Sequence, residues 1–204
     1  MGNFGLKVNR FYEIFVEQNG YVMVLEGLKN TLLIAVIGLI IGIVIGTLIA
    51  AIRTIPQYKV LPRVLNGICS VYVGIFRGTP MVVQLLVFYY VMLPLMGVKM
   101  TGVQVSMIVF GLNSAAYISE IMRSGIMSVD SGQMEAGRAV GLSYGTTMMK
   151  IVIPQAVKNI LPTLGNEFIA LIKETSVVSF VGATDLYVAF NYIAVSYTHL
   201  RAHE

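Results

Sequence analysis

The sequence predicts an all-α polytopic membrane protein, and three observations support this fold class. Of its 204 residues, 56% are hydrophobic and 12% are charged, whereas soluble domains have about 25% charged residues. The mean hydropathy of +0.79 is typical of chains that cross a bilayer several times. Residues Thr31 to Ile52 form a run of 22 residues without a charge. We expect four helical membrane spans.

Residues 1–30 form a mixed, charged segment before the first span. Phe11, Ile14 and Phe15 fall at helical spacing, which predicts a short amphipathic helix lying on the membrane. The long apolar run begins only at Thr31, and no small-residue cleavage site follows a short apolar core, so the segment is not a signal peptide. We expect residues 31–195 to form the transmembrane domain and residues 196–204 to form a tail.

The first span is predicted over Thr31 to Ile52, about 33 Å of helix, which is enough to cross the bilayer core. A stripe of small residues recurs along it at every fourth position: Gly38, Gly42, Gly46 and Ala50. Such stripes let two helices approach closely in lipid. The partner helix can belong to this chain or to a second subunit, and the spacing alone does not distinguish the two.

The region after the first span is basic and then apolar. Lys59 and Arg63 lie in a connection that we expect to be cytoplasmic. The apolar run over residues 64–76 is too short to span, so we predict an interfacial helix with Arg77 at the inner surface. The second span is then expected from Pro80 to Gly97, with Thr79 as its N-cap. The alternative is one broken helix with Arg77 in the membrane, which costs at least about 2.5 kcal/mol unless the charge is paired.

The third span is predicted from Gly102 to Met122, with Asn113 and Ser114 near its middle. Glu120 and Arg123 lie near its inner end at i, i+3, and we expect them to form a structural ion pair.

The fourth predicted span, residues 150–172, is unusually polar. Pro154, Lys158, Asn159, Pro162, Asn166 and Glu167 interrupt it. Such polarity is unfavourable against lipid, so this helix should face protein or a water-filled path. Its length places Lys173 and Glu174 near the outer edge of the membrane.

A polar stretch, Glu135 to Pro154, separates the third and fourth spans. Its composition fits two short helices joined at Gly141, and composition alone also fits an ordinary cytoplasmic loop. The order is Glu135-Ala136-Gly137, three residues, Gly141, nine residues, Ile151, one residue, and Ile153-Pro154. We call residues 132–154 the signature loop.

This spacing resembles the signature of binding-protein-dependent ABC importer permeases, which reads Glu-Ala-Ala, three residues, Gly, nine residues, Ile, one residue, Leu-Pro. Two positions depart from it, Gly137 in place of the second Ala and Ile153 in place of Leu. We expect Gly137 to loosen the first short helix by roughly 1 kcal/mol relative to Ala.

Three further motifs resemble the polar amino-acid branch of these permeases. They are Arg77-Gly78-Thr79-Pro80 with the Val-Val-Gln-Leu-Leu that follows, the stretch from Asn113 to Glu120, and the stretch from Lys173 to Ser179. The resemblance covers about residues 26–186. It implies the type I ABC importer permease fold with five spans, of which four are present here.

The resemblance implies the transmembrane subunit of an ATP-driven importer that moves polar or charged L-amino acids by alternating access. Its implied partners are ABC ATPase subunits, a second permease subunit (identical or different), an extracytoplasmic amino-acid-binding protein and membrane lipid. The implied ATPase-coupling residues are Gln133, Glu135, Ala136, Gly137, Gly141, Leu142 and Pro154. The candidates for the substrate pathway are Asn113, Ser114, Asn166, Glu167 and Glu174, and interhelical hydrogen bonding is an alternative role for each.

Several kinds of chemistry are not expected from this chain. It lacks the pattern Gly, four residues, Gly-Lys-Ser/Thr, so ATP would be bound and hydrolysed by a partner chain and this subunit would not be an enzyme. The single Cys69 excludes an internal disulfide and a cysteine-built metal site. We expect no cofactor and no metal. The net charge of +4 is ordinary for a membrane protein and does not indicate nucleic acid.

The resemblance implies a multi-pass protein of the bacterial inner membrane, and the charge distribution, counted with the N-terminus outside, agrees with a cytoplasmic signature loop. The inner loops carry seven basic residues (Arg53, Lys59, Arg63, Arg77, Arg123, Arg138 and Lys150) and the outer ones four (Lys7, Arg10, Lys29 and Lys99). Two other functions stay open. A secondary transporter would need ion-coupling carboxylates and usually an internal repeat, which we do not see. A non-transporting scaffold would explain the small-residue stripe and the polar loop without a pathway.

The C-terminal end departs from the family. A fifth span is expected after Leu186, but residues 187–195 are far short of the about 20 needed to cross. Residues 196–204 resemble a translated sequencing-adapter tail, and a genuine short variant with a polar extension is the alternative. We expect these last residues to form a loose end, with an apolar groove where the fifth helix belongs.

Overall fold

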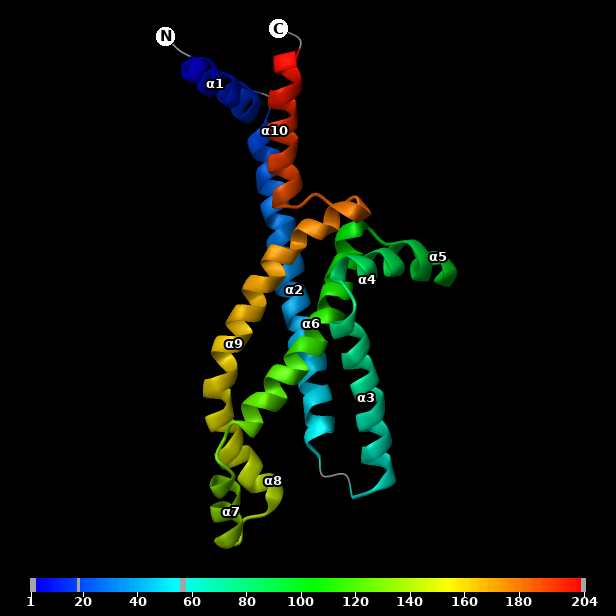
Figure 1. The fold of residues 1–204 in the computed structure, drawn as a ribbon, viewed down its shortest axis with the longest axis vertical. Coiled ribbons are helices and arrows are strands. Elements are labelled where there is room, and N and C mark those ends of the chain that lie inside the picture. The colour runs from blue at the N-terminus through cyan, green and yellow to red at the C-terminus, as the bar shows by residue number, and fades with distance from the viewer. Residues whose placement is uncertain (1–2, 18, 56–57, 203–204) are drawn as a thin grey trace.

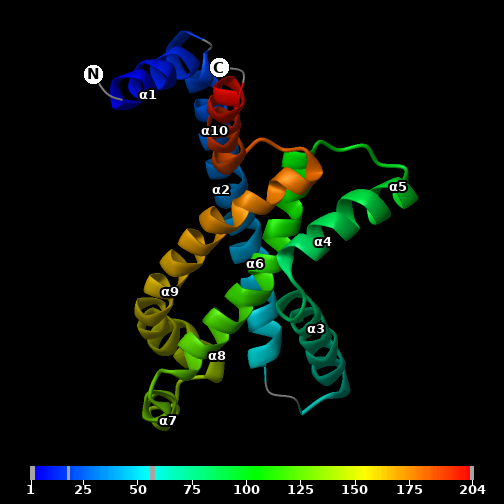
Figure 2. The same ribbon diagram turned by 45° about the horizontal axis from the view of Figure 1, so that its top comes forward.

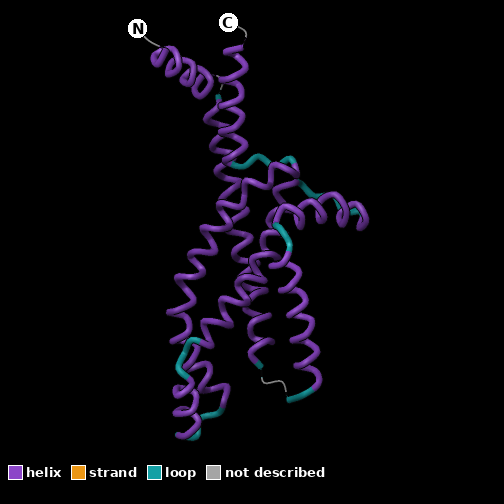
Figure 3. Tube along the Cα trace, in the orientation of Figure 1, coloured by secondary structure: helices purple, strands orange, loops and turns teal. Residues whose placement is uncertain are grey.

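A computed structural model describes residues 3–17, 19–55 and 58–202, and no strand occurs in these ranges (Figures 1 and 3). Three elements are π-helical turns (η1, η2, η3) and η4 is a 3-10 helix. The elements in order are α1 (Asn3–Tyr12), η1 (Glu13–Glu17), α2 (Gly20–Thr54), α3 (Val60–Gly78), α4 (Met81–Val87), η2 (Phe88–Met92), α5 (Leu93–Met96), α6 (Gly102–Met127), α7 (Ser131–Ala139), α8 (Tyr144–Thr147), η3 (Met148–Val152), α9 (Ile153–Glu174), η4 (Thr175–Val181) and α10 (Leu186–Ala202).

Among the described residues, three helices are long and apolar enough to cross a membrane: α2, α3 and α6. A fourth span is possible if the bent pair formed by residues 144–181 and 186–195, with a bend of 61°, counts as one. The predicted number of four spans therefore stays a prediction. Helix α2 has 35 residues and crosses the boundary expected at residue 30.

The small-residue stripe of α2 packs against α6 of the same chain, as the two adjacent helices in Figure 1 indicate. A Cβ atom at Gly38 would lie 3.2 Å from Cβ of Phe110, and one at Gly42 would lie 2.8 Å from Oγ of Ser114. Glycine is needed here because any larger side chain would push the two helices apart. Of the two partners left open by the sequence, the structure shows the one within this chain.

The second helix corrects one expectation. The interfacial helix expected over residues 64–76 is wrong in extent, because α3 runs from Val60 to Gly78 and is long enough to cross. Arg77 lies in the last turn of α3, at the end far from the basic α2–α3 connection, and its place relative to the membrane surface stays a prediction. The apolar helix that follows, Met81–Met96, is too short to count as a span alone. The chain is thus interrupted between Gly78 and Met81, just after Arg77, and whether α3 and the helix after it form one broken span stays open.

In Figure 2, α3 ends against the middle of α6, and α4 leaves in a different direction. Pro80 cannot donate a backbone hydrogen bond, so α3 cannot continue through it. Both Thr79 and Pro80 have extended backbones, with ψ of 144° and 139°.

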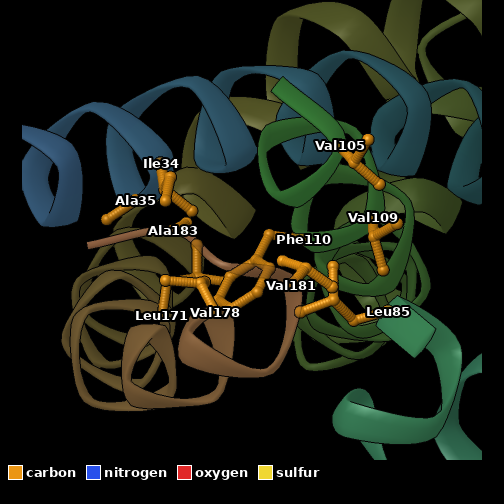
Figure 4. Close-up of a cluster of buried hydrophobic side chains, with 10 residues drawn as sticks. All are labelled: Ile34, Ala35, Leu85, Val105, Val109, Phe110, Leu171, Val178, Val181 and Ala183. Atoms are coloured by element: carbon orange, nitrogen blue, oxygen red, sulfur yellow. The ribbon is translucent and has the colours of Figure 1, made fainter. Parts of the chain in front are cut away.

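The main apolar core lies where α2, α4, α6, α9 and η4 meet (Figure 4). Phe110 of α6 is fully buried at its centre, with Ile34 of α2 and Leu171 of α9 among the buried neighbours. This core lies away from α7 and α8, and α3, α6 and α9 diverge from it toward the other end of the molecule (Figure 1).

The C-terminal end also differs from expectation. Helix α10 continues to Ala202, so the loose end expected from residue 196 is wrong for the backbone up to that residue. His203 and Glu204 lie outside the described residues. The foreign origin of residues 196–204 and the apolar groove stay predictions.

Candidate functional site

The signature loop folds into two short helices, α7 and α8, at one end of the molecule beyond the spans (Figure 1). Each helix begins with a capping side chain. Asp130 Oδ1 accepts a hydrogen bond from the Gly132 backbone N–H at 2.7 Å, and Ser143 Oγ accepts one from Thr146 N–H at 3.2 Å. These caps satisfy backbone donors that a helix start leaves free, so both helices begin where the chain leaves a loop.

Gly141 forms the turn between α7 and α8, as the sequence predicts. Its φ is +86°, in the left-handed region that glycine adopts without strain. The Gly141 N–H donates to Arg138 O at 3.0 Å, and the Leu142 N–H donates to Gly137 O at 3.1 Å. This pair of hydrogen bonds is a Schellman motif, which ends a helix and turns the chain back.

Gly137 is the point where the two short helices touch. A Cβ atom there would lie 2.4 Å from Cγ2 of Thr147, and the Thr147 side chain is fully buried. The glycine that departs from the family signature therefore allows a closer approach than alanine would. This contact offsets the loss of helix propensity that the sequence predicts for Gly137.

One hydrogen bond ties the loop to α9, and a second joins α9 to the end of α6. Gln155 Nε2 donates to Gln133 Oε1 at 3.2 Å, and Asn159 Nδ2 donates to Ser128 Oγ at 2.8 Å. Both bonds connect the start of α9 with the chain near α7 or the end of α6. Displacement of the loop would therefore act on α9 as well as on α6.

The outer surface of the loop carries the remaining coupling candidates. Glu135, Ala136 and Gly141 are exposed, Leu142 is half-buried, and Pro154 is exposed near the start of α9. Val140 beside the turn is 78% exposed and was not selected from the sequence. Its apolar side chain in an otherwise polar loop could have indicated a contact surface.

An apolar pocket of about 430 Å³ separates the loop from the spans. Its walls come from the end of α2, from α6, from the loop and from α9, with Met148 and Met149 of η3 among them. Methionine side chains adapt to irregular space, so this junction can repack more readily than the core around Phe110.

The structure brings only two of the five pathway candidates together. Ser114 Oγ of α6 donates to Glu167 Oε1 of α9 at 2.9 Å. Asn113 points to a different neighbour, and Asn166 and Glu174 are exposed on α9 without a hydrogen bond to the first pair. Glu174 lies two helical turns after Glu167 on the same face of α9, whereas Asn166 lies on a neighbouring face.

Asn113 belongs to a cluster at the break between α3 and α4. Its Nδ2 donates to Phe76 O at 3.1 Å and to Gln84 Oε1 at 3.0 Å. Gln84 Nε2 in turn contacts Phe76 O at 2.8 Å and Thr79 O at 3.0 Å. The two amides thus satisfy carbonyls that the broken helix leaves free. We did not predict this role of Gln84 from the sequence, although a polar residue inside an apolar run can indicate such a buried hydrogen-bonding role.

Glu120 forms the expected ion pair with Arg123, whose Nη2 lies 2.8 Å from Glu120 Oε2. A second cation, Arg53 of α2, pairs with the other carboxylate oxygen and was not expected. The pair is therefore a three-residue cluster that joins α2 to α6. No group of three His, Cys, Asp or Glu side chains suited to a metal ion occurs within the described ranges.

Comparison with solved structures defines the class of protein. A chain from the crystal structure of an amino acid ABC transporter with histidines is 33% identical, with a TM-score of 0.76, and the match covers 91% of each chain. A chain of the MetNI methionine ABC transporter in an inward-facing conformation is 19% identical, with a TM-score of 0.70 over 88% of this chain and 90% of that one, and it supports the fold alone. The fold is that of a type I ABC importer permease, as predicted.

Residues 38–195 match the family model of the binding-protein-dependent transport system inner membrane component, and the chain belongs to this family. The putative glutamine transport system permease protein GlnP of Rickettsia bellii (strain RML369-C) is 42% identical over 163 residues, 80% of this chain and 72% of the relative. The arginine transport system permease protein ArtQ of Bacillus subtilis (strain 168) is 39% identical over the same shares. The family and the apolar helices make this chain a multi-pass inner-membrane subunit of an ABC importer.

Proposed function

We propose that this subunit imports polar or charged L-amino acids by alternating access, driven by ATP that a separate ATPase subunit hydrolyses. The signature loop carries this proposal, because it is a compact two-helix unit that projects beyond the spans and is hydrogen-bonded to α9, which in turn is hydrogen-bonded to the end of α6 (Figure 1). Relatives named as glutamine and arginine permeases support the substrate class.

The loop is built to move as one body. The Schellman turn at Gly141 and the close contact between Gly137 and Thr147 hold α7 against the chain that follows it. The exposed Glu135 and Val140 present a charged and an apolar side chain on its outer surface, where an ATPase subunit would dock. Closure of the ATPase subunits then moves the loop and, through Gln133 and Gln155, the start of α9.

The substrate pathway runs along the faces of α6 and α9. Ser114 and Glu167 are its candidate polar groups, with the exposed Asn166 and Glu174 further along α9. A second permease subunit would cover the exposed polar face of α9, since such polarity is unfavourable against lipid. An extracytoplasmic amino-acid-binding protein would deliver the substrate on the opposite side from the cytoplasmic loop.

Reconstitution tests this proposal. The chain is co-expressed with the ATPase and the binding protein of its own system and placed in proteoliposomes. We expect the ATPase to co-purify, the binding protein to stimulate ATP hydrolysis, and uptake of one or more amino acids among glutamine, arginine, histidine and cystine. Uptake that follows an ion gradient without ATPase would indicate a secondary transporter. A complex with no uptake under either condition would indicate a scaffold.

A further inference from the structure

Arg77 is exposed in the last turn of α3, far from the basic start of that helix. Fourteen residues separate it from Arg63 near the start of α3, which is about 21 Å of helix. Its guanidinium carbon stands 5.3 Å from the ring centroid of Tyr117 in α6. The end of α3 approaches the middle of α6 in both ribbon views (Figures 1 and 2).

Arg77 is not needed as a cap for α3. Arginine in the last turn of a helix often hydrogen-bonds the free carbonyls there. Here Thr79 Oγ1 donates to Ile75 O at 2.8 Å, and the amides of Gln84 and Asn113 donate to Phe76 O. Other side chains therefore hydrogen-bond the backbone carbonyls at the break, and the guanidinium group of Arg77 is not needed for that role.

Arg77 also lacks a carboxylate partner among the described residues. Both ion pairs found there engage Glu120, which lies one turn beyond Tyr117 on α6. Each Glu120 oxygen is already bound by a cation, Arg53 on one and Arg123 on the other. An unpaired cation within a membrane bundle is costly, and such residues usually mark a pathway for a charged substrate.

The contact with Tyr117 orients the charge without consuming its donors. A guanidinium group over an aromatic ring uses its face, so the N–H groups in its plane stay available. Two of these donors match the two oxygens of a carboxylate. Arg77 is exposed and Tyr117 is 37% exposed, so a ligand can reach this position.

On α6, Tyr117 lies between the face that contacts α3 and the face that contacts α9. Asn113, one turn before it, faces α3, and Ser114 faces Glu167 of α9. A cation from α3 and a carboxylate from α9 therefore border the same strip of α6. An amino acid carries both charges, so it complements this strip in a way that a simple anion does not.

We propose that Arg77 binds the α-carboxylate of the transported amino acid as it passes the α3–α4 break. This inference rests on the proposed function, since it takes an amino acid to be the substrate. An acidic side chain of the second permease subunit is the other source of a carboxylate. The lack of a carboxylate partner for Arg77 among the described residues, together with the carboxylate of Glu167 on the far side of the α6 strip, favours the substrate.

The test compares amino acids with their α-carboxamides, which keep the side chain and lose the negative charge. Binding of L-glutamine, L-arginine and L-histidine and of their α-carboxamides is measured by equilibrium dialysis on the assembled permease–ATPase complex without binding protein. We expect the wild type to prefer the imported amino acid over its α-carboxamide by about tenfold to a hundredfold. Arg77→Gln should lose that preference, and Arg77→Lys should keep part of it. Arg63→Gln, on the same helix, is the matched control and should leave it unchanged.

Each outcome separates the explanations. An Arg77→Gln complex that stays assembled and keeps the full preference overturns the proposal. Loss of the second permease subunit from that complex on size-exclusion chromatography assigns the carboxylate to the partner and overturns it as well. Wild-type proteoliposomes that import no amino acid refute the proposed function. Import by the wild type, with equal import by Arg77→Gln, refutes only the assignment of Arg77.

Discussion

Gly137 lies directly against Thr147 across the two halves of the signature loop: a Cβ atom on Gly137 would lie 2.4 Å from Cγ2 of Thr147. Thr147 is fully buried and its hydroxyl donates to Ser143 O at 3.0 Å, so it cannot easily move aside. The glycine therefore sets the distance between α7 and the helix that leads into α9.

Gly137→Ala should strain this contact even though alanine matches the family signature. Overpacking of this kind costs about 1–3 kcal/mol, more than the roughly 1 kcal/mol that alanine gains in helix propensity. We expect weaker stimulation of ATP hydrolysis by the binding protein, with an unchanged amount of subunit in the membrane. Gly145→Ala is the matched control, because nothing lies within 4 Å of a Cβ atom there. Full stimulation in Gly137→Ala would contradict this interpretation.

Gly141→Val should disrupt the turn and weaken docking of the ATPase. The φ of +86° is unfavourable for a β-branched residue by at least about 1–2 kcal/mol. The measurement is the fraction of ATPase that co-purifies with the permease from detergent. Gly141→Asn is the comparison variant, because asparagine tolerates the left-handed region better. Normal transport by the valine variant would refute the assignment of this turn to coupling.

Gln84 and Asn113 should be energetically coupled across the α3–α4 break. Replacing either with leucine removes a donor to Phe76 O and the hydrogen bond between the two amides. A double-mutant cycle in detergent, read by thermal unfolding, should give a coupling energy of about 0.6 kcal/mol and up to about 1.7 kcal/mol. Thr163→Ala, exposed on α9, is a control that should change stability little. Additive effects of the two leucine substitutions would show that the amides act independently.

Cysteine labelling should establish the sidedness of the loop. In a Cys69→Ala background, Tyr58→Cys and Ser131→Cys should react with impermeant thiol reagents only after the membrane is opened. Lys99→Cys should react in intact cells. The three positions are exposed, with Tyr58 at 91%, so accessibility of the side chain itself does not limit the reaction. The reverse pattern would overturn the predicted topology.

Features governed by neighbouring residues were predictable. The turn at Gly141 depends on hydrogen bonds that span six residues, and the Glu120–Arg123 pair depends on one helical turn. Both could be located by spacing alone. Arg53 could not, because its partner Glu120 is 67 residues away and the contact exists only when α2 packs on α6.

The extent of α3 is a clearer example. Counting apolar residues gave a helix over residues 64–76, too short to cross. The structure extends α3 at both ends and lets Gln84 and Asn113 take the carbonyls at its break. Packing against α6 thus accommodates a polar interruption that a residue count treats as a boundary.

The chain alone was sufficient to predict an all-α permease, its family and the two-helix signature loop, because composition, periodicity and the spacing of Glu135, Gly141 and Pro154 are properties of the chain itself. The three-dimensional arrangement decided which helix meets the glycine stripe of α2, why position 137 is glycine, and which side chain Arg77 contacts. Capping and helical periodicity act over one or two turns, whereas the depth and partners of a side chain are set by whichever helix packs beside it.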